Sequence, residues 1–369
     1  MSDGHDHSQT DGAPPRPRRQ EQEPASEEII EVAPGILRSQ LPISIPGLGH
    51  VNCYILEDER GFALVDPGLP GKESYVALKA RLKQAGVPLK RVHSVIVTHS
   101  HPDHFGGATR LRADSGADIV THRQFRVLWD PTEPPDVDLE SASGPLLDPE
   151  GNPRIKRLPW DPSPWGGAGM SIPWQRKAQI RVVRTFPKLM RLPRPTVHLD
   201  DAQTIKFARR EWVAIHTPGH TEDHLCLFDP AEGVMLSGDH VLPTITPHIS
   251  GMIRAADPLA LFFASLDKVG EYGDRTNIVL PAHGNPFTDL GGRAEAIKRH
   301  HYERLDILRT KSAEMGHPAT VMEFSKHLFS PRSQGTMADS ETFAHLEHLR
   351  LAGEAEVRRA DGMLEYSVG

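Results

Sequence analysis

The chain has 369 residues, of which 38% are hydrophobic, and its formal net charge is −7. This length is enough for one large domain and a small second one. The acidic balance gives no general reason to expect nucleic-acid binding, and the lack of any run of eighteen apolar residues argues against a transmembrane segment.

The N-terminal residues 1–27 are polar and rich in proline, with no aliphatic or aromatic residue after Met1 except alanine. Such a segment cannot bury enough apolar surface to offset the entropy of ordering, so we expect a disordered tail. It also lacks the apolar core of a signal peptide, which favours a cytoplasmic protein. The two cysteines, Cys53 and Cys226, lie in apolar strand-like runs and are expected to be buried thiols in a reducing compartment.

Residues 28–65 read as consecutive strands joined by turns at Pro34-Gly35 and at 59–61. The spacing of apolar residues over 72–85 then predicts a helix that ends at Gly86, and residues 92–97 form an apolar, β-branched run typical of a buried strand. This alternation is consistent with half of a layered α/β sandwich with helices outside.

The stretch THSHPDHFGG, residues 98–107, follows that buried strand and precedes a helical pattern. It places His99, His101, Asp103 and His104 on a strand-to-helix loop, where imidazole and carboxylate donors suit two metal positions. Gly106 and Gly107 would let the backbone approach a neighbouring segment closely. The alternative is a polar loop with surface histidines, since the chain contains 21 of them.

Residues 130–195 form a long stretch rich in proline, glycine and tryptophan. Its second half has no acidic residue from 162 to 199, and 174–190 has the spacing of a basic amphipathic helix weakened by Pro187. We interpret the stretch as a lid that accepts an acyl chain on its apolar side and an anionic group on its basic side. A solvated surface helix and a membrane-surface contact are the alternatives.

Four further strand-like segments each end in a residue that could serve a metal site. Three of them end in His220, Asp239 and His283, and an earlier one ends in Asp66. The nearby His216, His224, His240 and His248 are expected to be packing or hydrogen-bonding residues.

The motifs LVDPG, THSHPDH, TPGHT, SGDH and PAHG, in this order, resemble those of the metallo-β-lactamase superfamily over about residues 28–290. The resemblance implies an α/β fold, an αββα sandwich, with a two-metal site along one edge. Asp at position 239 and the Asp103–His104 pair resemble the glyoxalase II, ribonuclease Z and lactonase branches. They depart from the antibiotic-hydrolysing zinc β-lactamases.

The resemblance assigns roles to seven candidate metal ligands. His99, His101 and His220 would hold one metal, Asp103, His104 and His283 the other, and Asp239 would bridge the two together with a hydroxide. Asp103 and Asp239 would also orient that hydroxide, and Asp66 would orient a ligand without binding metal. Zinc is the expected metal, with iron or manganese as alternatives.

From residue 292 the pattern changes to three helices, at 293–315, 319–329 and 338–352, followed by extended pieces at 355–358 and 363–367. This order resembles a winged-helix module, so we divide the chain into a catalytic domain at 28–291 and a small domain at 292–369. The third helix is acidic, so we expect no DNA binding and favour packing against the catalytic domain or a homodimer contact.

We therefore expect a binuclear metal-dependent hydrolase that acts on a small acyl substrate, a thioester or lactone-like ester, with an anionic group as a further option. No serine elbow or cysteine placed for covalent catalysis is evident. The alternatives are a phosphodiesterase resembling ribonucleases, a mononuclear iron thiol dioxygenase, and a winged-helix regulator that binds nucleic acid.

Overall fold

A computed structural model of the chain describes residues 19–127, 163–167, 173–185, 192–253 and 255–369. None of the helices in this described part combines the length and the apolar character that crossing a membrane requires.

The first sheet contains, among the described residues, seven strands in the order in which they occur in the chain. Its first four strands are antiparallel neighbours, whereas β4, β5, β6 and β7 run parallel. The strands are β1 (Ile30–Ala33), β2 (Ile36–Ile45), β3 (Leu48–Asp58), β4 (Gly61–Val65), β5 (Val92–Ile96), β6 (Asp118–His122) and β7 (Val197–Leu199).

The second sheet has, within the described residues, the order β12-β11-β10-β9-β8, and β11 and β12 are its parallel pair. Its strands are β8 (Thr204–Phe207), β9 (Arg210–His216), β10 (Leu225–Asp229), β11 (Val234–Gly238) and β12 (Ile278–Pro281). The outer layers and the connections contain α1 (Lys72–Gln84), α2 (Pro102–Phe105), α3 (Ala108–Ser115), α4 (Trp174–Thr185) and α5 (Pro258–Gly270).

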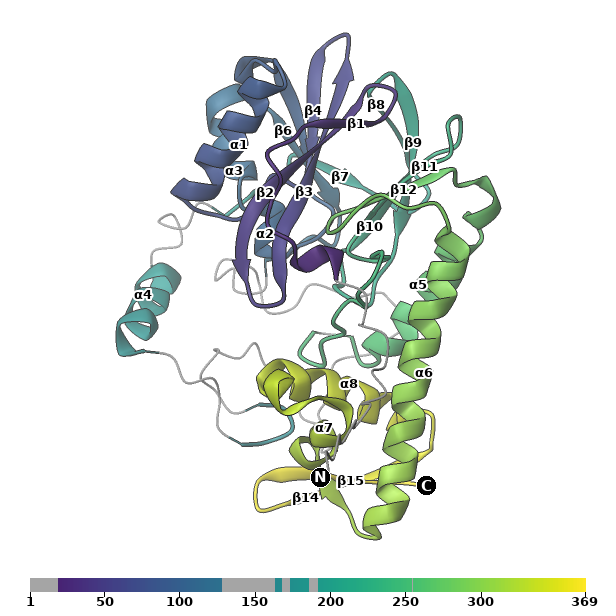
Figure 1. Ribbon diagram of the computed structural model, residues 1–369. Coiled ribbons are helices and arrows are strands. Elements are labelled where there is room, and N and C mark those ends of the chain that lie inside the picture. The colour runs from purple at the N-terminus through teal and green to yellow at the C-terminus, as the bar shows by residue number, and fades with distance from the viewer. Residues whose placement is uncertain (1–18, 128–162, 168–172, 186–191, 254) are drawn as a thin grey trace, which may run out of the picture.

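The core residues show that these elements form four layers. Tyr54 and Leu56 of β3 face Trp212 and the rest of the second sheet, whereas Ile55 between them packs against the side of α1. This alternation is what a strand buried on both faces requires. The outer face of the second sheet packs on α5, and Figure 1 shows the resulting αββα sandwich.

The C-terminal part contains α6 (Leu290–Met315), β13 (Ala319–Thr320), α7 (Val321–Leu328), α8 (Thr336–Leu351), β14 (Ala355–Ala360) and β15 (Met363–Val368). The predicted three helices and hairpin are thus confirmed. The sequence predicted a helix from residue 319, but the helix begins at Val321. The reason is a capping box: the Thr320 hydroxyl accepts from the Glu323 N–H, and the Glu323 carboxylate accepts from the Thr320 N–H, which keeps Thr320 extended.

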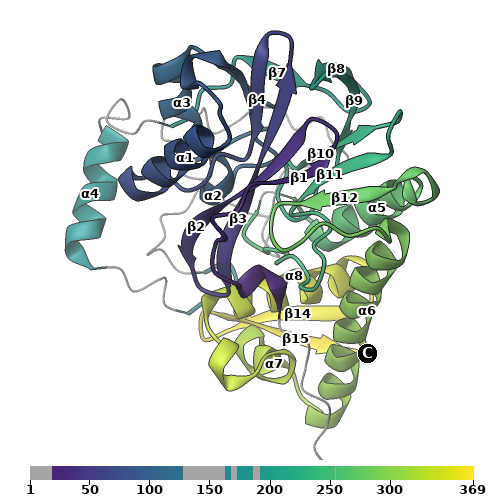
Figure 2. The ribbon, with the colours of Figure 1, turned by 45° about the horizontal axis from the view of Figure 1, so that its top comes forward.

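The C-terminal elements share one hydrophobic cluster with α5 and the second sheet. Phe343 of α8 and Tyr366 of β15 belong to it, as does Phe262 of α5. Glu341, His345 and other polar residues of α8 are buried as well, so this helix packs against the body of the protein as predicted. Figure 2 shows α8, β14 and β15 beside α6, at the end of the sandwich.

The expectation of a disordered tail over residues 1–27 is wrong for residues 19–27, whereas residues 1–18 lie outside the described residues. A short 3-10 helix spans Gln20–Gln22, and the Glu21 carboxylate is buried. It accepts hydrogen bonds from the backbone N–H groups of Thr244 (2.8 Å) and Ile245 (3.1 Å). Polar contacts, which the apolar content of the segment could not reveal, therefore hold these residues.

Both cysteines are free and buried, as expected, and burial raises the pKa of the Cys226 thiol to about 12. The predicted helix over 174–190 is present as α4 to Thr185, and residues 186–190 lie outside the described part. Trp174 and Val182 of α4 are exposed, and Figure 1 shows the helix outside the sandwich, on the side of α1.

We expect Phe343→Ala to lower the free energy of unfolding by about 3–5 kcal/mol, because it empties a buried site beside Trp165. Met337→Ala, on the same helix but 59% exposed, is the matched control and should change stability little. Urea denaturation followed by fluorescence measures both. Equal, small effects would show that α8 does not contribute to the shared core.

Candidate metal centre

The loop between β5 and α3 is held by the segment that follows β4. Asp66 accepts from the Thr98 backbone N–H (2.9 Å) and from the Thr98 hydroxyl (2.8 Å). A Cβ on Gly106 would lie 1.9 Å from the backbone nitrogen of Pro70, so only glycine permits this approach. The close packing that the sequence predicted here is confirmed.

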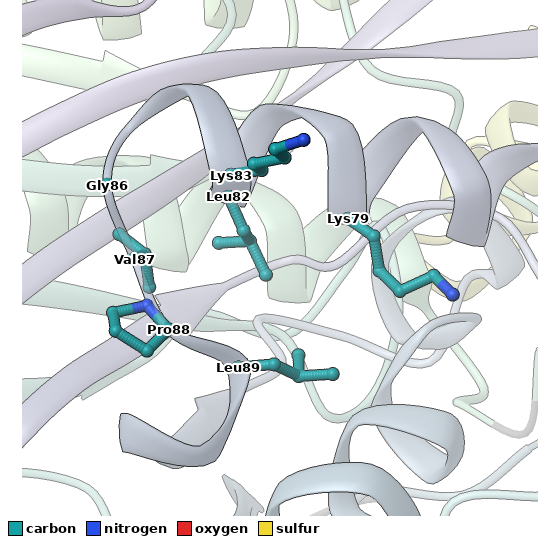
Figure 3. Close-up of a pocket in the computed structure, with 7 residues that line it drawn as sticks. All are labelled: Lys79, Leu82, Lys83, Gly86, Val87, Pro88 and Leu89. Atoms are coloured by element: carbon teal, nitrogen blue, oxygen red, sulfur yellow. The ribbon is translucent and has the colours of Figure 1, made fainter.

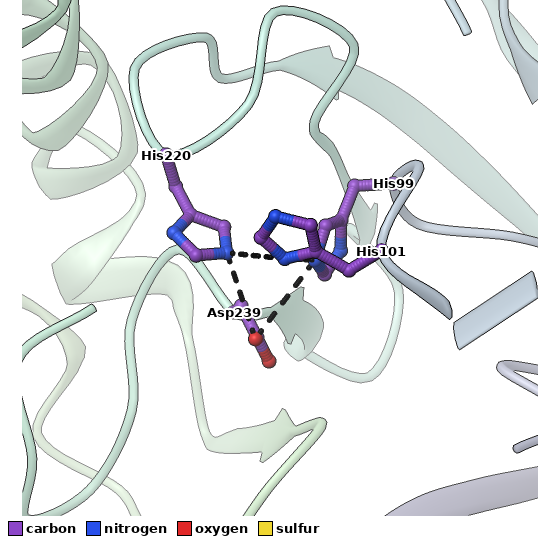
Figure 4. A group of neighbouring side chains, drawn as sticks. All are labelled: His99, His101, His220 and Asp239. Atoms are coloured by element: carbon purple, nitrogen blue, oxygen red, sulfur yellow. Dashed lines mark hydrogen bonds and ion pairs between the residues drawn. The ribbon is translucent and has the colours of Figure 1, made fainter. Parts of the chain in front are cut away.

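The first group of candidate ligands contains His99, His101, His220 and Asp239, which Figure 4 shows converging from three loops. The Nδ1 atom of His101 lies 2.9 Å from Nε2 of His99 and 3.1 Å from Nε2 of His220. Three ring nitrogens therefore meet at one point. Nitrogen lone pairs that face each other this closely repel, so the space between these three nitrogens must hold either shared protons or a cation.

The second group contains Asp103, His104 and His283, all of which are buried. The Oδ2 atom of Asp103 lies 3.5 Å from Nε2 of His104 and 3.5 Å from Nε2 of His283. Tetrahedral zinc with nitrogen ligands at about 2.0–2.1 Å would separate its ligand atoms by roughly 3.3 Å. The spacing of this group is close to that value.

Asp239 lies between the two groups. Its Oδ2 atom is 3.7 Å from Nε2 of His220 and 3.5 Å from Nε2 of His104, and its Oδ1 atom is 3.3 Å from Nε2 of His283. One carboxylate therefore faces donors of both groups. A carboxylate with this position can contact two cations at once.

Hydrogen bonds on the far side of three rings fix which nitrogen faces the centre. His220 donates from Nδ1 to the carbonyl oxygen of His248 (2.7 Å), and His283 donates from Nδ1 to the carbonyl oxygen of His50 (2.5 Å). Because a carbonyl only accepts, Nε2 of each neutral ring carries a lone pair directed at the centre.

His104 has the same arrangement, because its Nδ1 donates to Oδ2 of Asp66 (2.9 Å). Its Nε2 atom, together with Nε2 of His283 and Oδ1 of Asp239, is buried without a hydrogen-bond partner among the described residues. Buried polar atoms without partners are costly unless a ligand satisfies them. These atoms fit a metal site, and Asp66 orients a ring of that site, which is the position expected of it.

The pKa shifts differ between the two groups. Burial lowers the pKa of His99 and of His101 well below the ordinary value, which keeps both rings neutral and able to donate a lone pair. Burial acts to lower the pKa of His104 as well, but the carboxylates of Asp103, Asp239 and Asp66 outweigh it and raise this pKa well above the ordinary value. The same carboxylates would attract a divalent cation.

The four histidines that were expected to pack or to form hydrogen bonds do so, and the sequence did not predict that two of them support the candidate centre. His224 accepts at Nε2 from the backbone N–H of Asp239 (3.0 Å), so it fixes the residue between the two groups. His248 makes a side-chain contact at Nδ1 with Glu341 of α8 (3.1 Å). His216 stacks on His122 with ring centroids 3.8 Å apart, and His240 is buried against Phe262, so both are packing residues as expected.

The predicted lid over 130–195 falls largely outside the described residues. Within the described part, Trp165 is buried and contacts Phe343 of α8, and its carbonyl oxygen accepts from the backbone N–H of Leu364. This piece therefore packs on the C-terminal elements. The lid itself stays a prediction.

A surface hollow of about 380 Å³ lies where α1 ends, lined by residues that include Leu82, Val87 and Leu89 (Figure 3). The chain enters β5 from this side, whereas the histidine loop follows the other end of β5. The hollow is therefore remote from the candidate metal centre and adds nothing to it.

Comparison with known proteins supports these features. The family model described as "Metallo-beta-lactamase superfamily" matches residues 46–283. The probable metallo-hydrolase YqjP of Bacillus subtilis (strain 168) is 25% identical over 86% of this chain and 93% of its own length. An atrochrysone carboxyl ACP thioesterase of Cryptosporiopsis is 33% identical over 26% of this chain and 27% of its own length.

Two solved structures are similar over nearly the whole chain. A metallo-beta-lactamase family protein from Thermus thermophilus has 27% identity and a TM-score of 0.69, covering 92% of this chain and 100% of its own. A beta-lactamase domain protein from Burkholderia ambifaria has 25% identity and a TM-score of 0.72, covering 94% of this chain and 96% of its own.

Replacing Asp66 by Asn tests how much the orientation of His104 matters. Asp66 has a positive φ of 54°, which Asn tolerates, so the backbone should persist while the charged acceptor of His104 is lost. We expect metal affinity to fall by about 10- to 100-fold, measured by competition with a chelating dye. Asp274→Asn, at an exposed carboxylate, is the control, and equal affinities in both variants would contradict the role given to Asp66.

Proposed function

The chain belongs to the metallo-β-lactamase superfamily and is a metal-dependent hydrolase, and we propose that it uses two metal ions to hydrolyse an acyl thioester or lactone-like ester. The observation that carries the two-metal proposal is the position of Asp239 between two groups of buried donors. We propose His99, His101 and His220 as ligands of one metal and Asp103, His104 and His283 as ligands of the other, with Asp239 shared.

Two divalent ions held by these residues, most simply zinc, would supply a hydroxide nucleophile at neutral pH and polarise the carbonyl oxygen of the substrate. The residues of the chain have distinct tasks around them. His104, His220 and His283 are held by hydrogen bonds at Nδ1, so their lone pairs need no reorientation when metal binds. Asp103 and Asp239 would orient the nucleophile and accept its proton.

The acyl substrate is supported by what the named relatives act on. Besides the atrochrysone carboxyl ACP thioesterase, a hydroxyacylglutathione hydrolase of Albidiferax ferrireducens is 38% identical over 21% of this chain and 27% of its own length. Both names denote hydrolysis of a thioester, whereas phosphodiester cleavage rests on the resemblance to ribonuclease Z alone. The acyl thioester is therefore the preferred substrate class.

We also propose that residues 292–369 form a winged-helix-like module that closes one end of the site. Its support is the order of three helices and a hairpin, together with the contact between Glu341 and His248. DNA binding by α8 is disfavoured because the helix is buried and its acidic side chains would repel DNA phosphates.

We expect two metal ions per chain when the protein is purified without chelators and analysed by inductively coupled plasma mass spectrometry. Asp103→Ala should lower the count toward one, because it removes a ligand of one group only. His101→Ala should remove the other metal, and His327→Ala, at an exposed histidine, should leave both. A single iron per chain that is indifferent to Asp103→Ala would contradict the binuclear proposal.

A panel of reporter substrates tests the reaction class. We expect the metal-loaded protein to hydrolyse acyl thioesters or lactones at least about tenfold more efficiently, in kcat/KM, than a bis-phosphodiester reporter. Chelation should abolish this turnover. Turnover of the phosphodiester alone would favour the ribonuclease-like alternative, and oxygen uptake with a thiol substrate would favour the dioxygenase.

A further inference from the structure

A polar pocket of about 460 Å³ lies between α6, the segment 244–246 and the start of the described chain. We call it the arginine pocket, because four arginines contribute to its lining. The lining residues are Arg19, Thr244, Ile245, Thr246, Arg293, Ala296, Arg299, His300, Glu303 and Arg304.

The arginine pocket is next to the candidate metal centre on the His283 side. A Cβ on Gly284, the residue after His283, would lie 2.6 Å from Cγ of Pro243 and 3.5 Å from Cβ of Gln20. Pro243 and Gln20 are the chain neighbours of Thr244 and Arg19, which line the pocket. Chain neighbours of the pocket lining therefore pack against the residue that follows His283.

The pocket also adjoins the His220 side. Arg304 donates to Glu341 (2.7 Å), Glu341 contacts the ring of His248 (3.1 Å), and the carbonyl oxygen of His248 accepts from His220. Two residues, Glu341 and His248, thus connect the wall of the pocket to a candidate ligand.

Two of the four arginines have structural partners. Arg293 donates to the carbonyl oxygens of Leu242 (2.6 Å) and Ile245 (2.7 Å), and Arg304 is paired with Glu341. These contacts fix two guanidinium groups in the pocket wall.

The other two arginines, Arg19 and Arg299, are exposed, and their side chains form no ion pair or hydrogen bond with any residue in the described ranges. Glu303 is the one acidic residue among the lining residues. The Glu341 carboxylate offsets the charge of Arg304 and the Glu21 carboxylate acts on Arg293, which leaves the guanidinium groups of Arg19 and Arg299 available to a ligand.

We propose that the arginine pocket binds a phosphate group carried by the substrate on its leaving-group side. Guanidinium groups form charge-assisted, bidentate hydrogen bonds with phosphate oxygens, and two available arginines match the charge of a phosphate monoester. The volume exceeds what a single phosphate needs, which leaves room for the chain that links it to the thiol. The inference deepens the proposed acyl hydrolase, on which it rests, by naming a phosphorylated thiol as its leaving group.

The test compares thioesters with the same acyl group and with thiols that end in a phosphate, a carboxylate or an uncharged group. We expect the wild type to have the lowest KM for the phosphate-bearing substrate. The double variant Arg19→Gln/Arg299→Gln should raise this KM by about tenfold or more and leave the KM for the uncharged thioester unchanged. Arg332→Gln, at an exposed arginine outside the pocket, is the matched control and should change neither value.

Calorimetric titration of the metal-loaded protein with inorganic phosphate measures phosphate affinity independently of catalysis. We expect weaker binding in the double variant than in the wild type and in Arg332→Gln. Phosphate that binds only at the metals would be unaffected by the two substitutions, and this result would overturn the proposal. If the double variant loses phosphate affinity but the wild type hydrolyses no thioester, the phosphate site is supported and the proposed reaction is refuted.

A preference of the wild type for the uncharged thioester, or a phosphate preference that survives the double substitution, would also overturn the proposal. A stronger preference for the carboxylate-terminated thiol would overturn the assignment of phosphate. Circular dichroism and metal analysis of the double variant must match the wild type, and Arg19→Lys/Arg299→Lys, which keeps the charge, should restore part of the affinity.

Discussion

The buried carboxylate of Asp239 is the constraint on which the rest of the site depends. A carboxylate at this depth requires positive charge or hydrogen-bond donors around it, and burial alone would raise its pKa. His283 and His104 instead hold this pKa well below the ordinary value, and His224 accepts from the backbone N–H of the same residue. Asp239 therefore lies where both groups of imidazoles face one anion, and two cations bound by these groups would share that carboxylate.

The sandwich supplies this arrangement because its strands end at the same edge. Asp66 follows β4, the histidine loop follows β5, Asp239 follows β11 and His283 follows β12. Each ligand thus starts from a rigid strand, and backbone carbonyls of His50 and His248 hold two of the rings from behind. The C-terminal elements add to this support, since Glu341 of α8 contacts the side chain of His248. Residues 290–369 therefore contact the residue whose backbone carbonyl holds the ring of His220.

The sequence was sufficient for the sandwich and for the residues that converge, because each candidate ligand directly follows an apolar strand-like run. It could not reveal the acceptors behind His220 and His283, since a backbone carbonyl has no side-chain signature. The contact of His248 with Glu341 joins residues 93 positions apart and was also invisible. The arginine pocket was missed for a related reason: Arg19 lies in a stretch whose composition predicts disorder, and buried hydrogen bonds of Glu21 hold that stretch.

Anomalous X-ray diffraction from crystals of the metal-loaded protein tests the central claim most directly. Data collected on both sides of the zinc absorption edge should show two separate peaks, one beside His99, His101 and His220 and one beside Asp103, His104 and His283, with Asp239 in contact with both. A single peak at full occupancy that is coordinated by the first group alone, with Asp103 and His283 hydrogen-bonded to protein or water instead, would contradict it.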